Sequence, residues 1–419
     1  SKSNFKIKNN YFYNSSVNLN LQKVNNDQYL KLYRIENKNL ILDKNLLHSF
    51  INFEGEKNNS KFATSFQVYE DLNKDKSSRY EYIYPKYEFQ KNFNEGRSNK
   101  FYFKTYGEQR QYETNIYEGI LINDIFYESE PNYSTNGFVS NINTLIKNVN
   151  VDANNSEKYK DKFDQSLSTV LQYNTELPLS KSSSNFIDKL TPKASLMFSP
   201  NETRNLVNDN IRVDANKIFS LNRIVSNETV EGGSSLTYGI SYSKKNKQKN
   251  KELINFDLAS LIRLKENLDL PKNSTLGKKS SDVFGKLEFN PNDKLKFNYN
   301  FALDNNFDKS NYDSFSTKIS LNKLVTTFEY FDEKKNLINE SFTSNSTFYE
   351  IDKNNSFNFN IRRNNELSAT EYYNLIYTYK NDCLIASLKF NKEFYKDSDL
   401  KPEKEIFFEL SLLPFGGTD

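Results

Sequence analysis

The sequence contains little of what an enzyme or a disulfide-stabilised protein requires. Among its 419 residues there are one cysteine, Cys383, and one histidine, His48. A single cysteine cannot form a disulfide within the chain, and a single imidazole leaves little for metal binding or for a Ser/His pair. Glycine is also scarce, and the EGGSS run at residues 231–235 lacks the lysine of a phosphate-binding loop. We therefore expect no catalytic residue, no cofactor and no metal site.

The sequence also lacks a charge excess and long apolar runs. The 57 Lys and Arg residues are nearly balanced by 54 Asp and Glu residues, a net charge of +3, which argues against nucleic acid as a partner. No stretch approaches the ~18 to 20 consecutive apolar residues of a transmembrane helix. Aromatic residues, in contrast, reach 15%, far above the content of a disordered polar chain. The chain must therefore build a large structure from Phe and Tyr.

The C-terminal third has the two-residue period of β-strands. In the segment at residues 295–303, Leu295, Phe297 and Tyr299 alternate with Lys296 and Asn298. Such alternation predicts a strand with one apolar and one polar face. Similar segments recur up to EIFFELSLL at residues 405–413, and we count about nine strands between residues 283 and 413.

The connections between these expected strands alternate in length. The short ones include PND, a minimal step at Lys323, DKNN and KND, whereas DNNFDKSNYD and NKEFYKDSDLKPEK are long. One connection, NNE, is short where the alternation calls for a long one. Transmembrane β-barrels have short periplasmic turns and longer extracellular loops, whereas a soluble β-sandwich has no reason to sort its loops by length. The pattern favours a large antiparallel barrel of the outer membrane. It places these residues at the periplasmic end: Asn354, Asn381 and Asp382. It places these at the extracellular end: Asp308, Lys396 and Asp399.

Cationic residues occupy the polar faces of the expected strands. We expect four of them inside the barrel: Lys296, Lys318, Arg362 and Lys389. There they could pair with a phosphorylated sugar or with luminal acids such as Glu409. An ordinary lumen of mixed charge would show the same pattern, and the residues alone do not separate the two interpretations.

Several segments resemble a known family. RYEYIYPKYEF at residues 79–89, with Pro85, resembles a proline-containing strand of that family, and residues 178–201 resemble its paired proline strands, with Pro192 and Pro200 in place. The most specific stretch is residues 218–242, which has an asparagine-arginine pair, then a glutamate-glycine turn, then a tyrosine-glycine strand. These motif residues are Asn222, Arg223, Glu231, Gly232, Tyr238 and Gly239. The order of these segments is similar to the C-terminal β-barrel of the LptD family, the lipopolysaccharide-assembly proteins also called organic solvent tolerance proteins.

The resemblance, strongest over residues 80–413, implies transport without bond chemistry. Family members receive lipopolysaccharide from a periplasmic Lpt bridge, hold an LptE lipoprotein inside the barrel, and release the lipid sideways into the outer membrane between the first and last strands. The closing strand here would be residues 405–413. Its seam residues would be Ile406, Phe408, Glu409, Leu410 and Leu412.

The family has about 26 barrel strands and an N-terminal periplasmic jellyroll. We therefore expect residues 1–419 to form one barrel domain, an N-terminally truncated part of such a barrel, with the jellyroll absent. The resemblance also implies that Cys383 forms a disulfide with a cysteine of the missing part. Two alternatives to the transport barrel stay open: a general porin or nutrient-receptor barrel, and a soluble structural β-protein.

Overall fold

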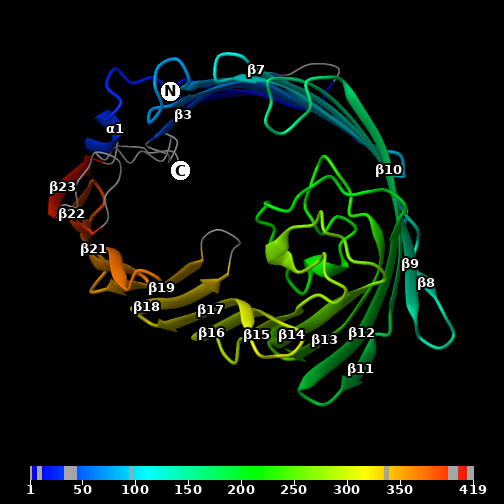
Figure 1. Ribbon diagram of the computed structural model, residues 1–419. Coiled ribbons are helices and arrows are strands. Elements are labelled where there is room, and N and C mark those ends of the chain that lie inside the picture. Colours follow the sequence, from blue (N-terminus) through cyan, green and yellow to red (C-terminus); the bar gives the residue numbers. More distant parts are fainter. Residues whose placement is uncertain are drawn as a thin grey trace.

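The computed structural model describes residues 2–6, 12–32, 45–94, 98–334, 339–394 and 404–412. They form one antiparallel sheet of 23 strands, which curves into a wide arch with its two ends on the same side (Figure 1). Each main strand pairs with the next main strand of the chain, as in an up-and-down barrel. The all-β fold that the alternating pattern predicts is therefore confirmed.

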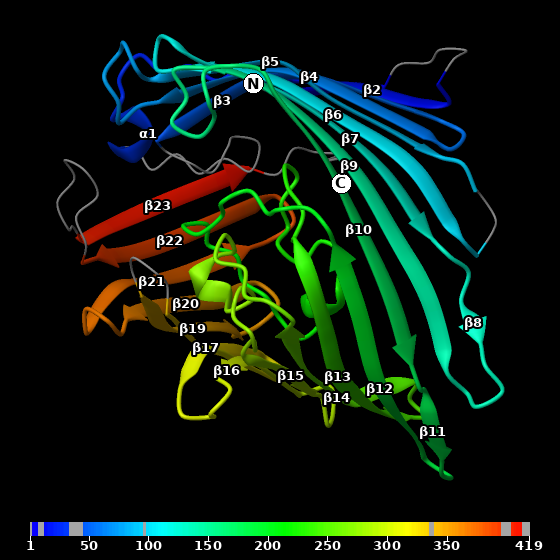
Figure 2. The ribbon, with the colours of Figure 1, turned by 45° about the vertical axis from the view of Figure 1, so that its right-hand side comes forward.

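The strands of the first half are long. They are β1 (Lys2–Lys6), β2 (Asn14–Asn20), β3 (Leu46–Lys57), β4 (Ser60–Asp71), β5 (Tyr80–Asn92), β6 (Lys100–Tyr112), β7 (Ile116–Glu128), β8 (Asn132–Tyr133), β9 (Val139–Asn154), β10 (Asp164–Glu176), β11 (Leu179–Ser182) and β12 (Phe186–Ser199). The short strands β8 and β11 extend the sheet beyond the rim, beside β9 and β12 (Figure 2).

The second half continues the same sheet. Its strands are β13 (Gly233–Asn246), β14 (Lys251–Arg263), β15 (Val283–Phe289), β16 (Leu295–Leu303), β17 (Ser310–Leu321), β18 (Leu324–Glu333), β19 (Glu340–Glu350), β20 (Asn355–Asn364), β21 (Ala369–Lys380), β22 (Leu384–Glu393) and β23 (Lys404–Leu412). The described helices are α1 (Tyr29–Leu32), η1 (Lys217–Phe219) and η2 (Lys272–Ser274). None of these helices has the length and apolar character needed to cross a membrane.

The nine strands expected between residues 283 and 413 correspond to β15–β23.

The two faces of the sheet differ in chemistry. On β12 and β13 the paired Leu196 and Leu236 are exposed on the outer face, whereas the paired Met197 and Ser235 are buried on the inner face. Side chains alternate between the faces of a strand, so the period of two in the sequence becomes an apolar outer surface and a more polar inner one.

Two prolines lie where the strand ladder is interrupted. Pro85 falls in β5 at a shift of register, where neither β4 nor β6 has a residue paired with it. Pro192 lies in β12 between the stretch that pairs with β11 and the stretch that pairs with β10. A proline has no N–H to donate, so a bulge or a change of partner strand accommodates it. Pro200 directly follows the last residue of β12.

The connections at the two ends of the sheet differ in length. At one end the turns of the second half are short, such as residues 247–250, 322–323 and 381–383. At the other end residues 200–232 and 264–282 are long and fold into the concave side of the arch (Figure 1). We call these two segments together the luminal insert. Within the described residues, β1 pairs with β2 alone and β23 with β22 alone, so each forms one end of the sheet.

Candidate functional site

The luminal insert has a hydrophobic core that it shares with the wall. Ile218 and Leu276, one from each inserted segment, are fully buried. They belong to one cluster with Leu261 of β14, Phe284 of β15 and Ala302 of β16. Burial of such side chains contributes ~1.5 to 3 kcal/mol each. The insert is therefore packed onto β14–β16 as part of the wall.

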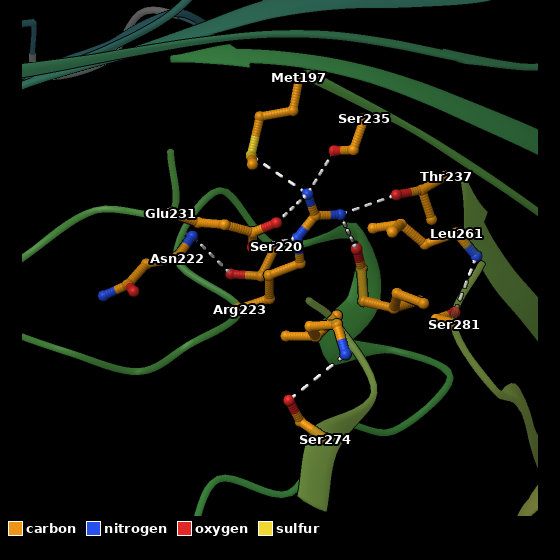
Figure 3. A network of polar contacts seen from close by, with 12 residues as sticks. Met197, Ser220, Asn222, Arg223, Glu231, Ser235, Thr237, Leu261, Ser274 and Ser281 are labelled. Carbon is orange, nitrogen blue, oxygen red and sulfur yellow. Dashed lines mark hydrogen bonds and ion pairs between the residues drawn. The ribbon is translucent and has the colours of Figure 1, made fainter. Parts of the chain in front are cut away.

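A buried cluster of three charged residues joins the insert to the wall, and Figure 3 shows two of them, Arg223 and Glu231. Arg223 and Glu231, both from residues 200–232, and Arg263, the last residue of β14, are 1%, 2% and 1% exposed. The Arg223 Nε and Nη2 atoms donate to the two carboxylate oxygens of Glu231 at 2.6 and 2.9 Å. The Arg263 Nη2 atom also donates to Glu231. We call these three residues the Arg–Glu–Arg cluster.

The other donors of Arg223 reach the wall. Its guanidinium donates to the hydroxyls of Thr237 and Ser235 on β13, at 2.9 and 2.6 Å. It also contacts the sulfur of Met197 on β12 and the Ile218 carbonyl oxygen. A buried charge is tolerated only when it is paired and hydrogen-bonded, and here the donors have partners.

The donors of Arg263 hold the two inserted segments together. Its Nε donates to the carbonyl oxygen of Leu276 at 2.7 Å and its Nη1 to that of Gly232 at 3.1 Å. Gly232 has no room for a side chain, because a Cβ there would overlap the carbonyl oxygen of Asn201. The two arginines and one glutamate leave a formal charge of +1 inside this cluster.

The insert also reaches β18, two strands beyond β16, through Arg212. Its guanidinium donates to both carboxylate oxygens of Glu333 on β18, at 3.1 and 2.9 Å. It also lies over the rings of Tyr312 and Phe331, 4.5 and 5.0 Å from their centroids. Since Arg212 is half exposed, this contact is weaker than the Arg–Glu–Arg cluster.

A second polar cluster joins the insert to the connection at residues 155–163. Glu228 accepts a hydrogen bond from the Tyr159 hydroxyl at 2.6 Å and pairs with Lys158 at 2.8 Å and with Arg204 at 3.4 Å. Burial, and then the hydrogen bond to Glu228, raise the pKa of the Tyr159 hydroxyl. Tyr159 therefore stays a neutral donor, and both cations lie over its ring at 5.0 Å.

The four cations expected in the lumen lie on strands β16, β17, β20 and β22. Lys296 and Lys318 are paired in register and share the face of β16 on which Ala302 contacts the insert. Arg362 pairs with Glu371 at 2.8 Å and lies 3.9 Å from the centroid of the Phe342 ring. Lys389 pairs with Glu409 at 2.7 Å. At least two of the four cations thus already have an acidic partner.

The expected closing strand corresponds to β23, which spans Lys404–Leu412. The side chains of Ile406, Phe408 and Leu410 are exposed on one face, and Glu409 lies on the other. The backbone of Leu412 pairs with Leu384, and residue 413 lies outside the described residues.

The remaining expected residues are dispersed. Tyr238 is exposed on the outer face, and Gly239 faces the backbone of Leu258 on β14. Asn222 lies beside Arg223 and donates to the carbonyl oxygen of Ser226 at 2.9 Å. Cys383 is exposed and free.

The turn at residues 351–354 lies at the same end of the sheet as the turn of Cys383. There, Asn354 donates to the carbonyl oxygen of Lys380, and Asn381 accepts from the N–H of Cys383. Asp382 belongs to the same turn as Asn381. Asp308 lies at the opposite end, and Lys396 and Asp399 fall outside the described residues.

The sequence alone brought two members of the Arg–Glu–Arg cluster to attention and missed the third. Arg223 and Glu231 stand in the motif, whereas Arg263 looks like any cation on the polar face of a strand. Lys147 of β9 was missed for the same reason, although it is buried and pairs with Asp124 at 2.7 Å. Arg212 was missed because it lies in the inserted segment, where no strand pattern draws attention to it. In the described residues no three His, Cys, Asp or Glu side chains come together as metal ligands.

Comparison with known proteins shows that the chain matches one protein family. The family model described as LptD, LPS transport system D, matches residues 1–364. No curated protein matches the chain.

Solved outer-membrane proteins resemble the structure loosely. The siderophore receptor PirA from Acinetobacter baumannii has 8% identity and a TM-score of 0.41, over 87% of this chain and 70% of that one. A mutant ferric enterobactin receptor from Pseudomonas aeruginosa has 7% identity and a TM-score of 0.39, over 94% and 67%. A mutant of the Rh. blastica porin has 9% identity and a TM-score of 0.27, over 71% and 94%. The family assignment rests on the family model.

Proposed function

The chain belongs to the LptD family, LPS transport system D, of the outer membrane, and on that premise we propose that it inserts lipopolysaccharide into the outer leaflet through a lateral seam at β23. The observation that carries the proposal is the family match, which spans residues 1–364. The fold is consistent with it, because β23 forms one end of the described sheet. The family is a transport component, and we propose a function without catalysis.

The physics of the substrate favours a seam. In a barrel the backbone N–H and C=O groups bond to neighbouring strands, which is necessary because lipid chains offer no hydrogen-bonding partners. An amphiphile with a large polar head can leave such a barrel only where one strand pair opens while the head stays in the wet lumen. The exposed apolar face of Ile406, Phe408 and Leu410 would then meet acyl chains, and Glu409 on the other face would border the lumen.

The partners follow from the same premise. We propose that an LptE-like lipoprotein occupies the part of the lumen that the insert leaves, and that a periplasmic Lpt bridge delivers the lipid through a domain N-terminal to this barrel. The exposed thiol of Cys383 would form a disulfide with that domain. Non-reducing electrophoresis of the full-length protein checks this link, and an unchanged mobility in Cys383→Ser would contradict it.

Photo-crosslinking in cells tests the seam. A photoreactive residue at Leu410 of β23 is expected to capture lipopolysaccharide. The matched control is Leu375 on β21, an exposed leucine on the same face and two strands away. Equal capture at both positions would contradict release at β23, because capture of lipid from the surrounding membrane alone would be the same at both positions.

A further inference from the structure

The luminal insert provides nearly all of the lining of a large cavity. The cavity has a volume of about 980 Å³ and is lined by residues 204–206, 208–212, 217 and 224–229 of the insert, with Lys158 from the neighbouring connection. It is at the upper end of the size range of small-molecule sites. Its lining is rich in amides, namely Asn205, Asn208, Asn210 and Asn227.

The cations of the cavity are already paired. Lys158 and Arg204 both pair with Glu228, at 2.8 and 3.4 Å. Arg212 pairs with Glu333 at 2.9 Å, and Lys217 lies 4.0 Å from Asp214. An anionic ligand would have to compete with these carboxylates for each cation, which makes a phosphate or carboxylate a poor match for the cavity.

The amides of the cavity are available. In the described part of the chain, the side-chain amides of Asn208, Asn210 and Asn227 form no hydrogen bond with the protein. Each amide has two N–H donors and one acceptor oxygen, which together match the hydroxyl group, itself both donor and acceptor. The unused hydrogen-bonding capacity of the cavity is therefore suited to a ligand with many neutral hydroxyls.

The scaffold that holds these amides is fixed. The segments that carry them flank Val213, Ile218 and Arg223, all buried in the insert core or in the Arg–Glu–Arg cluster. Arg204 is held against the ring of the buried Tyr159. A rigid frame lowers the entropy lost when a flexible ligand binds.

We propose that this cavity binds an uncharged oligosaccharide segment through hydrogen bonds between its asparagine amides and sugar hydroxyls. The inference rests on the proposed function and deepens it, since an oligosaccharide is the polar part of a lipopolysaccharide. It assigns to the insert the recognition of neutral sugars rather than of phosphate groups.

Binding of maltotriose, a trisaccharide without phosphate, tests the proposal. The whole protein is purified in a detergent that has no sugar headgroup, and binding is followed by ligand-observed NMR. We expect the double variant Asn208→Ala, Asn210→Ala to weaken binding about tenfold, from the loss of two hydrogen-bonding groups. Added salt should leave the affinity unchanged, because the contacts are between neutral groups.

The control is Gln248→Ala, an exposed amide in the 247–250 turn at the other end of the sheet, and it should bind as the parent does. The proposal is overturned if maltotriose does not bind, if the double variant binds it equally well, or if inorganic phosphate competes and salt weakens binding. The Leu410 crosslinking separates this result from the function. If Leu410 captures no lipopolysaccharide but maltotriose still binds, the proposed seam is contradicted. If Leu410 captures lipopolysaccharide but maltotriose does not bind, the cavity assignment is contradicted.

Discussion

Glu231 lies between two buried guanidinium groups and neutralises part of their charge. We expect Glu231→Gln to destabilise the protein by ~3 to 5 kcal/mol, because it leaves both arginines buried without an anion. The free energy of unfolding in detergent, from urea denaturation, measures the effect. The matched control is Glu202→Gln, an exposed acid on the same insert, which should change stability by less than ~0.5 kcal/mol. Equal effects from the two substitutions would show that Glu231 does not hold the insert.

Asp282 is the residue from which we expect a pH dependence. Burial raises the pKa of its carboxyl above the ordinary 3.8, and the hydrogen bond from Asn311 at 2.9 Å opposes the shift. The folded state therefore binds this proton more tightly than the unfolded state does. The resulting stability is full below the unfolded pKa and is lost as the pH rises through the raised folded pKa.

The substitution Asp282→Asn tests this sign. The asparagine keeps an oxygen that can accept from Asn311 but carries no charge, so the variant should be more stable than the parent at neutral pH. Its denaturation midpoint should also fall less between about pH 4 and pH 7. Parallel pH profiles for the two proteins would rule out a contribution from Asp282.

At the scale of the element, the strands were predictable from the sequence, whereas the luminal insert that packs against them was not. The alternation in residues 295–303 corresponds to β16, because a strand between lipid and lumen needs one apolar face whatever its neighbours are. The luminal insert has no such period. Its buried residues, such as Ile218 and Leu276, are buried by contacts between segments 58 residues apart, which no local pattern reveals. In the strand pattern Arg263 stands where the cation Lys296 stands, and only after folding does Arg263 meet Glu231 and the carbonyl oxygens of Gly232 and Leu276.

The positions of the turns at the two rims of the sheet predict how the barrel is oriented in the outer membrane. The short turns of Asn354 and Asn381 share one rim, and Asp308 lies on the other. A barrel with its long loops outside has the first rim in the periplasm. In a Cys383→Ser background, an impermeant thiol reagent applied to intact cells should label Asp308→Cys and should label Asn354→Cys only after the outer membrane is opened. Labelling of Asn354→Cys in intact cells would reverse the orientation.

At the scale of the whole molecule, the insert reduces the free cross-section inside the arch (Figure 1). Replacing residues 205–228 with a short Gly-Ser linker removes Arg223 and leaves Glu231 paired with Arg263, so the remaining cluster is neutral. We expect a larger single-channel conductance of this variant in planar bilayers. Replacing the 247–250 turn in the same way should leave the conductance unchanged. A conductance equal to that of the parent would mean that the insert does not limit the passage.

The Arg–Glu–Arg cluster and its partners all come from residues 197–276, a short part of the chain. The loop that must close to form it is therefore short, and closure of a short loop loses less conformational entropy than closure of the whole sheet. The neighbouring strands β12–β14 are joined as consecutive hairpins. During assembly the insert can thus dock on its own strands before the two ends of the sheet are formed, so that the wall is completed around an interior that is already in place.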